Sequence, residues 1–85
     1  MTKEEYYKFL VDFSSKEKEL ESSILLRRRM AKVAYDLYRI AKNDKMAKLM
    51  AKLSDSLFES NISLAKKNVN KIIGLVKAGQ VVSSN

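Results

Sequence analysis

The fold is decided by residues 26–42, which read LRRRMAKVAYDLYRIAK. Apolar side chains recur in this stretch at an alternating spacing of four and three residues, which places them on one face of an α-helix. They are Leu26, Met30, Val33, Leu37 and Ile40. A seam this narrow is typical of coiled-coil-like packing between helices. It predicts a helix whose apolar seam turns inward against neighbouring helices.

A second apolar strip with smaller side chains runs beside the first. Its members are Ala31, Ala34, Tyr38 and Ala41. The two strips together are wide enough to touch two neighbouring elements rather than one, and the alanines would let one neighbour approach closely. The segment is therefore expected at the centre of a small helical bundle.

The composition of the chain agrees with a helical fold. The sequence has 85 residues, no proline, no cysteine and two glycines, Gly74 and Gly79. Because helix breakers are scarce and helix formers abundant, an all-α protein is predicted. The length fits one small domain. Without thiols, disulfides and cysteine-based metal or redox chemistry are excluded.

The periodicity predicts four helices within a single domain that spans residues 1–79. They are expected at about 3–13, 15–42, 45–59 and 61–78, followed by a flexible C-terminal tail at 80–85. A capping box formed by Thr2 and Glu5 marks the start of the first helix. Residues 14–23 have almost nothing to bury, so the chain either continues as one long helix or hinges near Ser14-Ser15, and a hinge is favoured.

A second seam follows in the next helix and then loses its phase. The seam consists of Met46, Met50, Leu53 and Leu57. Continuing it would bury Asn68 and Lys71, which is costly. A break near residues 59–61 is therefore expected, followed by a new stripe made of Ile62, Ala65, Val69, Ile72 and Val76.

Short connections predict that sequential helices pack antiparallel. The expected fold is a small antiparallel bundle of three to four helices. A chain this short buries a limited core, so the bundle is expected to complete its core by homodimerisation. A helical hairpin that dimerises and a monomeric bundle are the alternatives.

The positive charge is strong and unevenly distributed. The formal net charge is +7. Residues 1–21 hold four lysines and six acids, whereas residues 22–85 hold thirteen lysines or arginines and four acids. A basic body of this kind indicates an anionic partner such as nucleic acid, an acidic protein surface or anionic lipid.

A cationic stripe runs opposite the apolar seam and supplies the candidate binding residues. With the flanking arginines and the lysines of the next helix, they are Arg27, Arg28, Arg29, Lys32, Tyr35, Arg39, Lys42, Lys45, Lys48 and Lys52. Arginine suits bidentate contact with phosphate. The pattern predicts sequence-tolerant, salt-sensitive binding to DNA or RNA through phosphates. The ordinary alternative is a solvated outer face of the bundle.

Other functional classes receive less support from the sequence. A helical interaction module that binds an acidic protein, as an adaptor, inhibitor or assembly subunit, is the second hypothesis. The chain has no histidine and no cysteine, so the commonest general bases, nucleophiles and metal ligands are missing. Neither enzymatic activity nor a metal or cofactor is expected. A polar start and no apolar run of about 18 residues predict a cytoplasmic protein without a membrane span.

Overall fold

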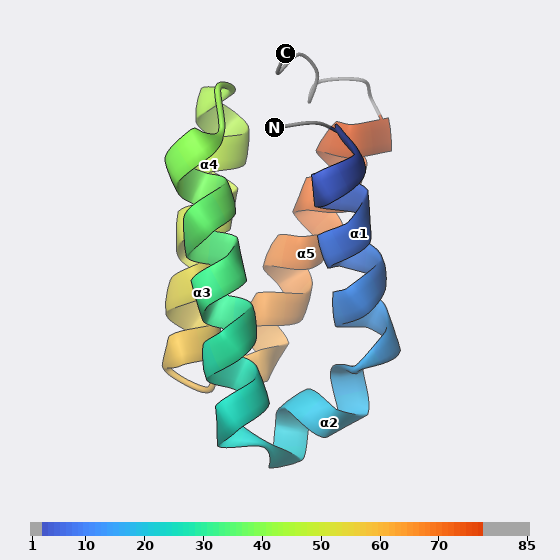
Figure 1. The fold of residues 1–85 in the computed structure, drawn as a ribbon, viewed down its shortest axis with the longest axis vertical. Helices are drawn as coiled ribbons and strands as arrows, with labels where there is room; N and C mark the ends of the chain where they lie inside the picture. The colour runs from blue at the N-terminus through green and yellow to red at the C-terminus, as the bar shows by residue number, and fades with distance from the viewer. Residues whose placement is uncertain (1–2, 78–85) are drawn as a thin grey trace.

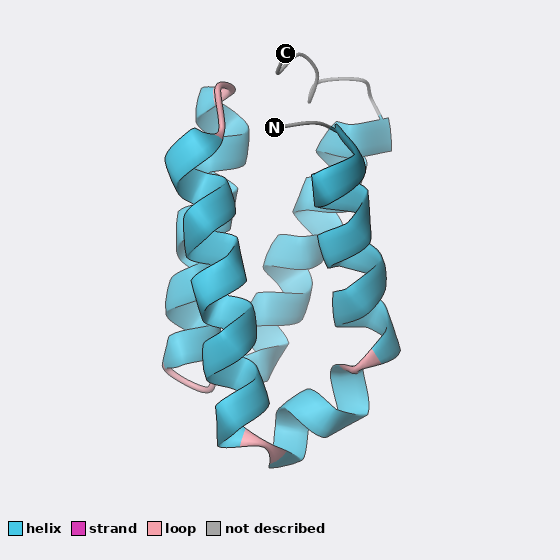
Figure 2. Ribbon diagram, viewed as in Figure 1, coloured by secondary structure: helices cyan, strands magenta, loops and turns pink. Residues whose placement is uncertain are grey.

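The computed structural model describes residues 3–77, and helices make up nearly all of this range (Figure 2). The elements are α1 (Lys3–Ser15), α2 (Glu17–Ser22), α3 (Ile24–Ile40), α4 (Asp44–Phe58) and α5 (Ile62–Lys77). Within residues 3–77 there is no strand, which confirms the all-α prediction for this range. Thr2, Gly79 and the predicted tail at 80–85 lie outside the described residues.

The helices form an antiparallel bundle (Figure 1). α3 and α4 pack most extensively, followed by α4 and α5. α1 lies on the opposite side of the molecule from the α3–α4 hairpin and runs antiparallel to α3. The short α2 crosses one end of the bundle and links the two. The bundle therefore has one tightly packed part, α3 to α5, and one more peripheral helix, α1.

The single helix expected at 15–42 is wrong, because the chain turns twice within that range. α1 ends at Ser15, and Lys16 forms a turn in which its amide donates to the Phe13 carbonyl at 3.1 Å. A second break falls at Ser23, whose backbone is extended and whose hydroxyl accepts from the Leu26 amide at 3.1 Å. This cap satisfies one of the amides at the start of α3. The breaks let α2 cross the bundle and bury Leu20 completely.

The turn between α4 and α5 is stabilised by backbone and side-chain hydrogen bonds. Ser60 adopts a φ of 62°, in the left-handed region. Its amide donates to the Leu57 carbonyl, and the Asn61 amide donates to the Ser56 carbonyl. This Schellman arrangement satisfies the last carbonyls of a helix. The Asn61 side chain then accepts from the Leu64 amide and starts α5.

The buried face of α3 combines residues from both predicted strips. Met30 and Leu37 of the seam are buried, together with Ala31 and Ala34 of the alanine strip, and Leu26 is partly buried. The expectation that the whole seam turns inward is wrong for two of its residues. Val33 is 42% exposed and Ile40 is 45% exposed.

Close packing of α3 against α4 explains this rotation. The Ser54 hydroxyl of α4 donates to the Ala31 carbonyl of α3 at 2.9 Å, and both residues are buried. Side chains as small as alanine leave room for such a contact between a side chain and a neighbouring backbone. When Ala31 and Ala34 face α4, the helical period turns Val33 and Ile40 away from the core.

The other helices contribute their apolar stripes to one core. The α4 seam (Met46, Met50, Leu53 and Leu57) and the α5 stripe (Ala65, Val69, Ile72 and Val76) are buried. Asn68, expected outside the core, is buried as well, and its amide nitrogen has no hydrogen-bond partner. α1 adds large rings, including Phe9 and Phe13, whose centroids lie 6.5 Å apart. Burial and the nearby Glu5 raise the pKa of Tyr6.

Enlarging Ala34 should test whether close approach of α3 and α4 determines the packing. Ala34 is completely buried. We expect Ala34→Leu to lower the free energy of unfolding by about 1–3 kcal/mol, because an added side chain forces the helices apart. Tyr35→Leu, at the exposed neighbouring position, should have a much smaller effect. Urea denaturation followed by circular dichroism measures both, and equal midpoints for the two variants would contradict the packing argument.

Candidate nucleic-acid interface

The ten candidate binding residues fall into three groups in the folded chain. Arg27 is buried. Arg28, Lys32 and Tyr35 are exposed, and each contacts a neighbouring side chain. The remaining six residues are exposed (Arg29, Arg39, Lys42, Lys45, Lys48 and Lys52). The sequence pattern grouped these ten together, but the fold gives them different surroundings.

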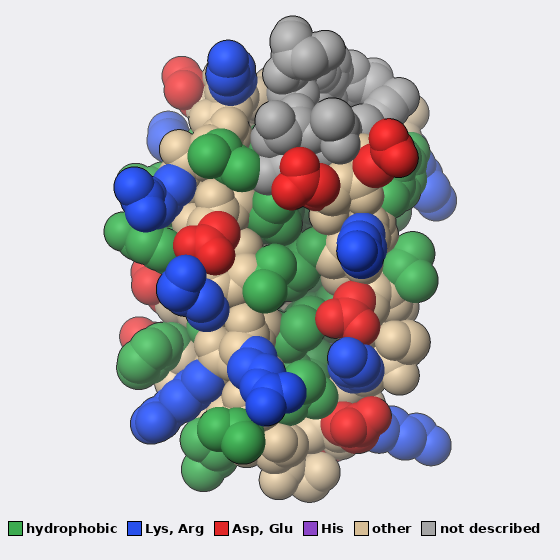
Figure 3. Space-filling model, viewed as in Figure 1, with side chains coloured by type: hydrophobic (Ala, Val, Ile, Leu, Met, Phe, Trp, Pro, Cys, Tyr) green, Lys and Arg blue, Asp and Glu red, His purple; other side chains and the backbone are tan. Residues whose placement is uncertain are grey.

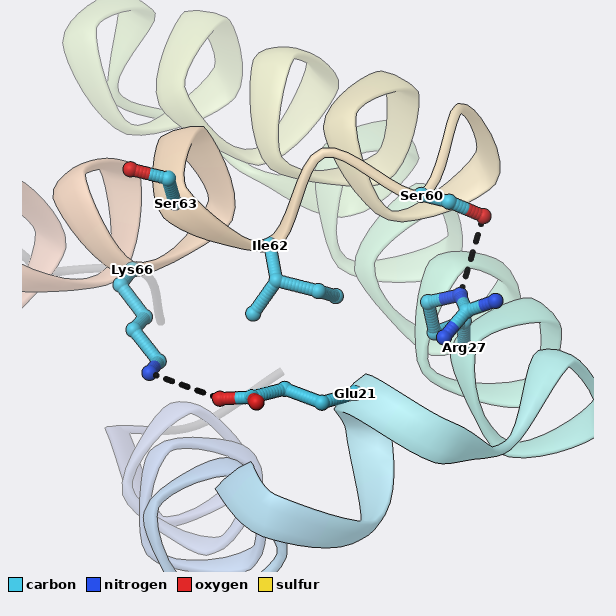
Figure 4. A pocket seen from close by; sticks show the side chains of 6 residues that line it. All are labelled: Glu21, Arg27, Ser60, Ile62, Ser63 and Lys66. Carbon is cyan, nitrogen blue, oxygen red and sulfur yellow. Dashed lines mark hydrogen bonds and ion pairs between the residues drawn. The ribbon is translucent and has the colours of Figure 1, made fainter.

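Arg27 connects three parts of the fold and does not belong to a binding surface. Its side chain is 9% exposed. Its Nε donates to the Ser60 hydroxyl at 3.0 Å (Figure 4). A terminal guanidinium nitrogen donates to the Leu20 carbonyl at 2.6 Å. Arg27 lies one turn before Ala31 and shares its inward face. The prediction that it contacts phosphate is therefore wrong.

The pocket beside Arg27 is polar, and its charges are compensated within the protein. It has a volume of about 560 Å³. Lys66 reaches into it and lies 3.4 Å from a Glu21 oxygen and 3.5 Å from a Glu17 oxygen. Arg27 is held by the two hydrogen bonds described above. The ion pairs of Lys66 hold α2 against the start of α5. Because both cations already have partners, the pocket offers little to an external anion.

Lys32 is paired within its own helix. Its ammonium group lies 3.0 and 3.1 Å from the two carboxylate oxygens of Asp36, one turn later. Exposed pairs of this type contribute little free energy, at most about 1 kcal/mol. The pair lowers the local positive potential, yet it can exchange with a phosphate at small cost.

Two aromatic contacts lie on the outer side of α3. The guanidinium carbon of Arg28 lies 5.7 Å from the centre of the Phe58 ring of α4, within the range of a cation–π contact. The Tyr35 and Tyr38 rings have centroids 5.7 Å apart. Phe58 is 64% exposed and was not among the predicted binding residues. Its position just off the α4 seam gave only a weak signal.

The clearest cationic surface surrounds the connection between α3 and α4. Within residues 3–77, Arg39, Lys42, Lys45 and Lys48 are exposed and form no ion pair. Lys52 continues the row one turn further along α4. Figure 3 shows basic side chains along the edge formed by the α3–α4 hairpin, with a smaller number of acidic ones among them, and side chains of both signs over α1. We call the set Arg39, Lys42, Lys45, Lys48 and Lys52 the hairpin cations.

Comparison with known proteins adds no functional assignment. No protein-family model, no curated protein and no solved structure matches the chain. In the described part of the chain, no three acidic side chains gather in a way that could hold a metal ion. None of the five helices between residues 3 and 77 is both long enough and apolar enough to cross a bilayer.

The different roles of two neighbouring arginines can be separated by stability measurements. Arg27→Met removes two hydrogen bonds from a charged donor and leaves the Leu20 carbonyl without its partner. We expect a loss of about 2–3 kcal/mol in the free energy of unfolding. Arg29→Met, at an exposed position, should change it by less than about 0.5 kcal/mol. Urea unfolding of both variants checks this, and equal stabilities would contradict a structural role for Arg27.

Proposed function

We propose that this chain is a small, basic, non-enzymatic protein that binds nucleic acid, DNA in particular, without reading its sequence. The observation that carries the proposal is the set of hairpin cations, which are exposed and unpaired around the α3–α4 connection. Phosphate contacts of this kind supply most of the affinity of sequence-tolerant binders. The cytoplasmic location expected from the sequence belongs to the same proposal.

The dimensions of α3 are suitable for contacts with several phosphates. Within α3, the stripe from Arg28 to Arg39 rises over eleven residues, or about 17 Å, and Lys42 follows in the connection after Ile40. Its last turn and the following connection carry Arg39 and Lys42 close to Lys45 at the start of α4. A duplex presents one phosphate charge for about every 1.7 Å along its axis. Several cations could therefore each meet a phosphate without any base contact.

Acidic side chains limit the strength of this surface. Asp36 pairs with Lys32, and Asp44 and Asp55 are exposed on α4. They reduce the positive potential without removing it, because the α3–α4 region still carries more basic than acidic residues. The proposed binding is therefore of moderate affinity and strongly dependent on salt.

Homodimerisation is proposed alongside nucleic-acid binding, which does not require it. Two copies would present two sets of hairpin cations on one particle. Linking two weak phosphate-binding surfaces raises the apparent affinity, provided both can engage the same strand or duplex. Pairing would therefore convert a modest monomeric surface into a more effective binder.

A protein-interaction module is the second candidate function. It is favoured by the exposed apolar side chains beside the core, among them Val33 and Ile40 of α3. In this alternative, an acidic protein rather than nucleic acid would contact the hairpin cations. The two candidates differ in one measurable property, because only the first requires binding to DNA or RNA of arbitrary sequence.

A mobility-shift experiment at two salt concentrations tests the proposed function. Duplex DNA and RNA of arbitrary sequence should be retained at about 50 mM salt and largely released at about 200 mM. The double variant Arg39→Glu, Lys42→Glu should weaken binding more than about tenfold. It should also reduce the slope of log affinity against log salt by about two, since two phosphate contacts are lost.

A matched control separates a local surface from overall charge. The double variant Lys18→Glu, Lys71→Glu changes the net charge equally but alters exposed residues of α2 and α5. It should reduce binding much less than the substitutions at residues 39 and 42. Equal losses would remove the hairpin cations from the proposal. No retention of either nucleic acid at low salt would reject nucleic-acid binding and favour the interaction module.

A further inference from the structure

A groove with an apolar floor runs between α1 and α3 on the face shown in Figure 3. It has a volume of about 950 Å³, and Phe9, Val11, Val33 and Leu37 lie along it. Phe9 and Leu37 belong to the edge of the core, but Val11 is 67% exposed and Val33 is 42% exposed. Ile40, at 45% exposure, extends the apolar surface along α3.

The two sides of this groove carry different charges. On the α1 side, Glu4, Lys8 and Asp12 follow one another at one-turn intervals and line the groove. On the α3 side, Lys32 and Asp36 directly precede the groove residues Val33 and Leu37. An apolar surface bordered by charges of both signs is typical of a protein interface and not of a solvated helix face.

We infer that a second copy of this chain covers the groove, with a two-fold axis parallel to α1 and α3. Such an axis places α1 of each copy against α3 of the other. The two grooves then face each other between these four helices. A two-fold axis running across the groove would instead place α1 on α1 and α3 on α3. The first arrangement sets the charges of α1 against opposite charges of α3, whereas the second sets like charges of the same helix against one another.

The order of charges along the helices supports the first arrangement. α1 and α3 run antiparallel (Figure 1), and an axis along the groove keeps each residue at its own height. Descending α1, the charges at residues 8 and 12 are positive and negative. At matching steps along α3, the charges at residues 36 and 32 are negative and positive. Opposite charges thus meet at each level of the contact.

The dimensions of this face are sufficient for a stable dimer. The helical bundle measures 35 × 20 × 18 Å along its principal axes, and the groove lies on the broad face. Standard protein interfaces bury about 800 Å² on each partner. A face of 35 × 20 Å, with side chains projecting from it, can supply an area of this order. The groove then provides the apolar centre, and the charged residues provide the rim.

This inference goes beyond the proposed function and can fail independently of it. The hairpin cations at the α3–α4 connection do not line the groove. A dimer would therefore leave them accessible. The measured quantity is the mass in solution, which does not depend on nucleic acid. Loss of dimerisation with retained DNA binding would overturn only the inference.

Light scattering and sedimentation of the purified chain test the position of the interface. The wild-type protein at about 50 μM should have twice the 9.7 kDa mass of the monomer. Val33→Asp should raise the dimer dissociation constant more than about tenfold, because it buries a charge at the centre of the contact. Leu64→Asp is the matched control, since Leu64 is 43% exposed on α5, away from the groove. It should leave the dimer intact.

Charge exchange tests the direction of the two-fold axis. Asp12→Lys and Lys32→Asp should each weaken the dimer, because each places like charges across the interface. The double variant should recover dimerisation, since its exchanged charges again attract between copies. In the alternative arrangement, α1 lies on α1 of the partner, so residue 12 does not face residue 32 and the double variant would recover nothing. Circular dichroism of every variant confirms that the helices are retained.

Three results would overturn the inference. A monomeric mass for the wild-type chain at about 50 μM would remove the dimer. A dimer that survives Val33→Asp but not Leu64→Asp would move the interface to another face. Weakening by both single charge reversals without recovery in the double variant would reject the axis parallel to the groove.

Discussion

The close packing of α3 against α4 is the constraint on which the rest of the structure depends. Ala31 and Ala34 are buried, and the hydrogen bond from the Ser54 hydroxyl of α4 to the Ala31 carbonyl of α3 joins the two helices there. Because α3 is a rigid helix, choosing this face sets the direction of every other side chain along it. Arg27 turns inward, while Val33 turns toward the groove beside α1.

The same rotation divides the positive charges of α3 between structural and surface positions. Arg27 donates hydrogen bonds to the Leu20 carbonyl and the Ser60 hydroxyl, and these bonds hold α2 against the α4–α5 turn. Lys32 is held by Asp36 within one turn. Arg28 and Arg29 are exposed near the start of the helix, whereas Arg39 and Lys42 are exposed around the α3–α4 connection. This distribution leaves two distinct surfaces, one cationic and one apolar, on different sides of α3.

The sequence predicted the helical class and part of the core with ordinary helical rules. The break near residues 59–61 followed from the cost of continuing the seam, yet Asn68 is buried in spite of that cost. The break at Ser23 was missed. A serine is compatible with a continuous helix as well as with a cap, so only the burial of Leu20 by α2 distinguishes the two. Among the candidate binding residues, the largest error concerns Arg27, which was predicted to contact phosphate and is buried.

The sequence by itself determined that the described chain is helical and that α3 has two apolar strips opposite a basic one. These properties follow from local composition and from the period of the helix. Only the tertiary structure decided which residues of each strip face the core, Met30 and Leu37 of one and Ala31 and Ala34 of the other. Both strips satisfy the same local periodicity, and the choice depends on how closely a neighbouring helix can approach. That approach is a property of the α3–α4 pair and cannot be read from either segment alone.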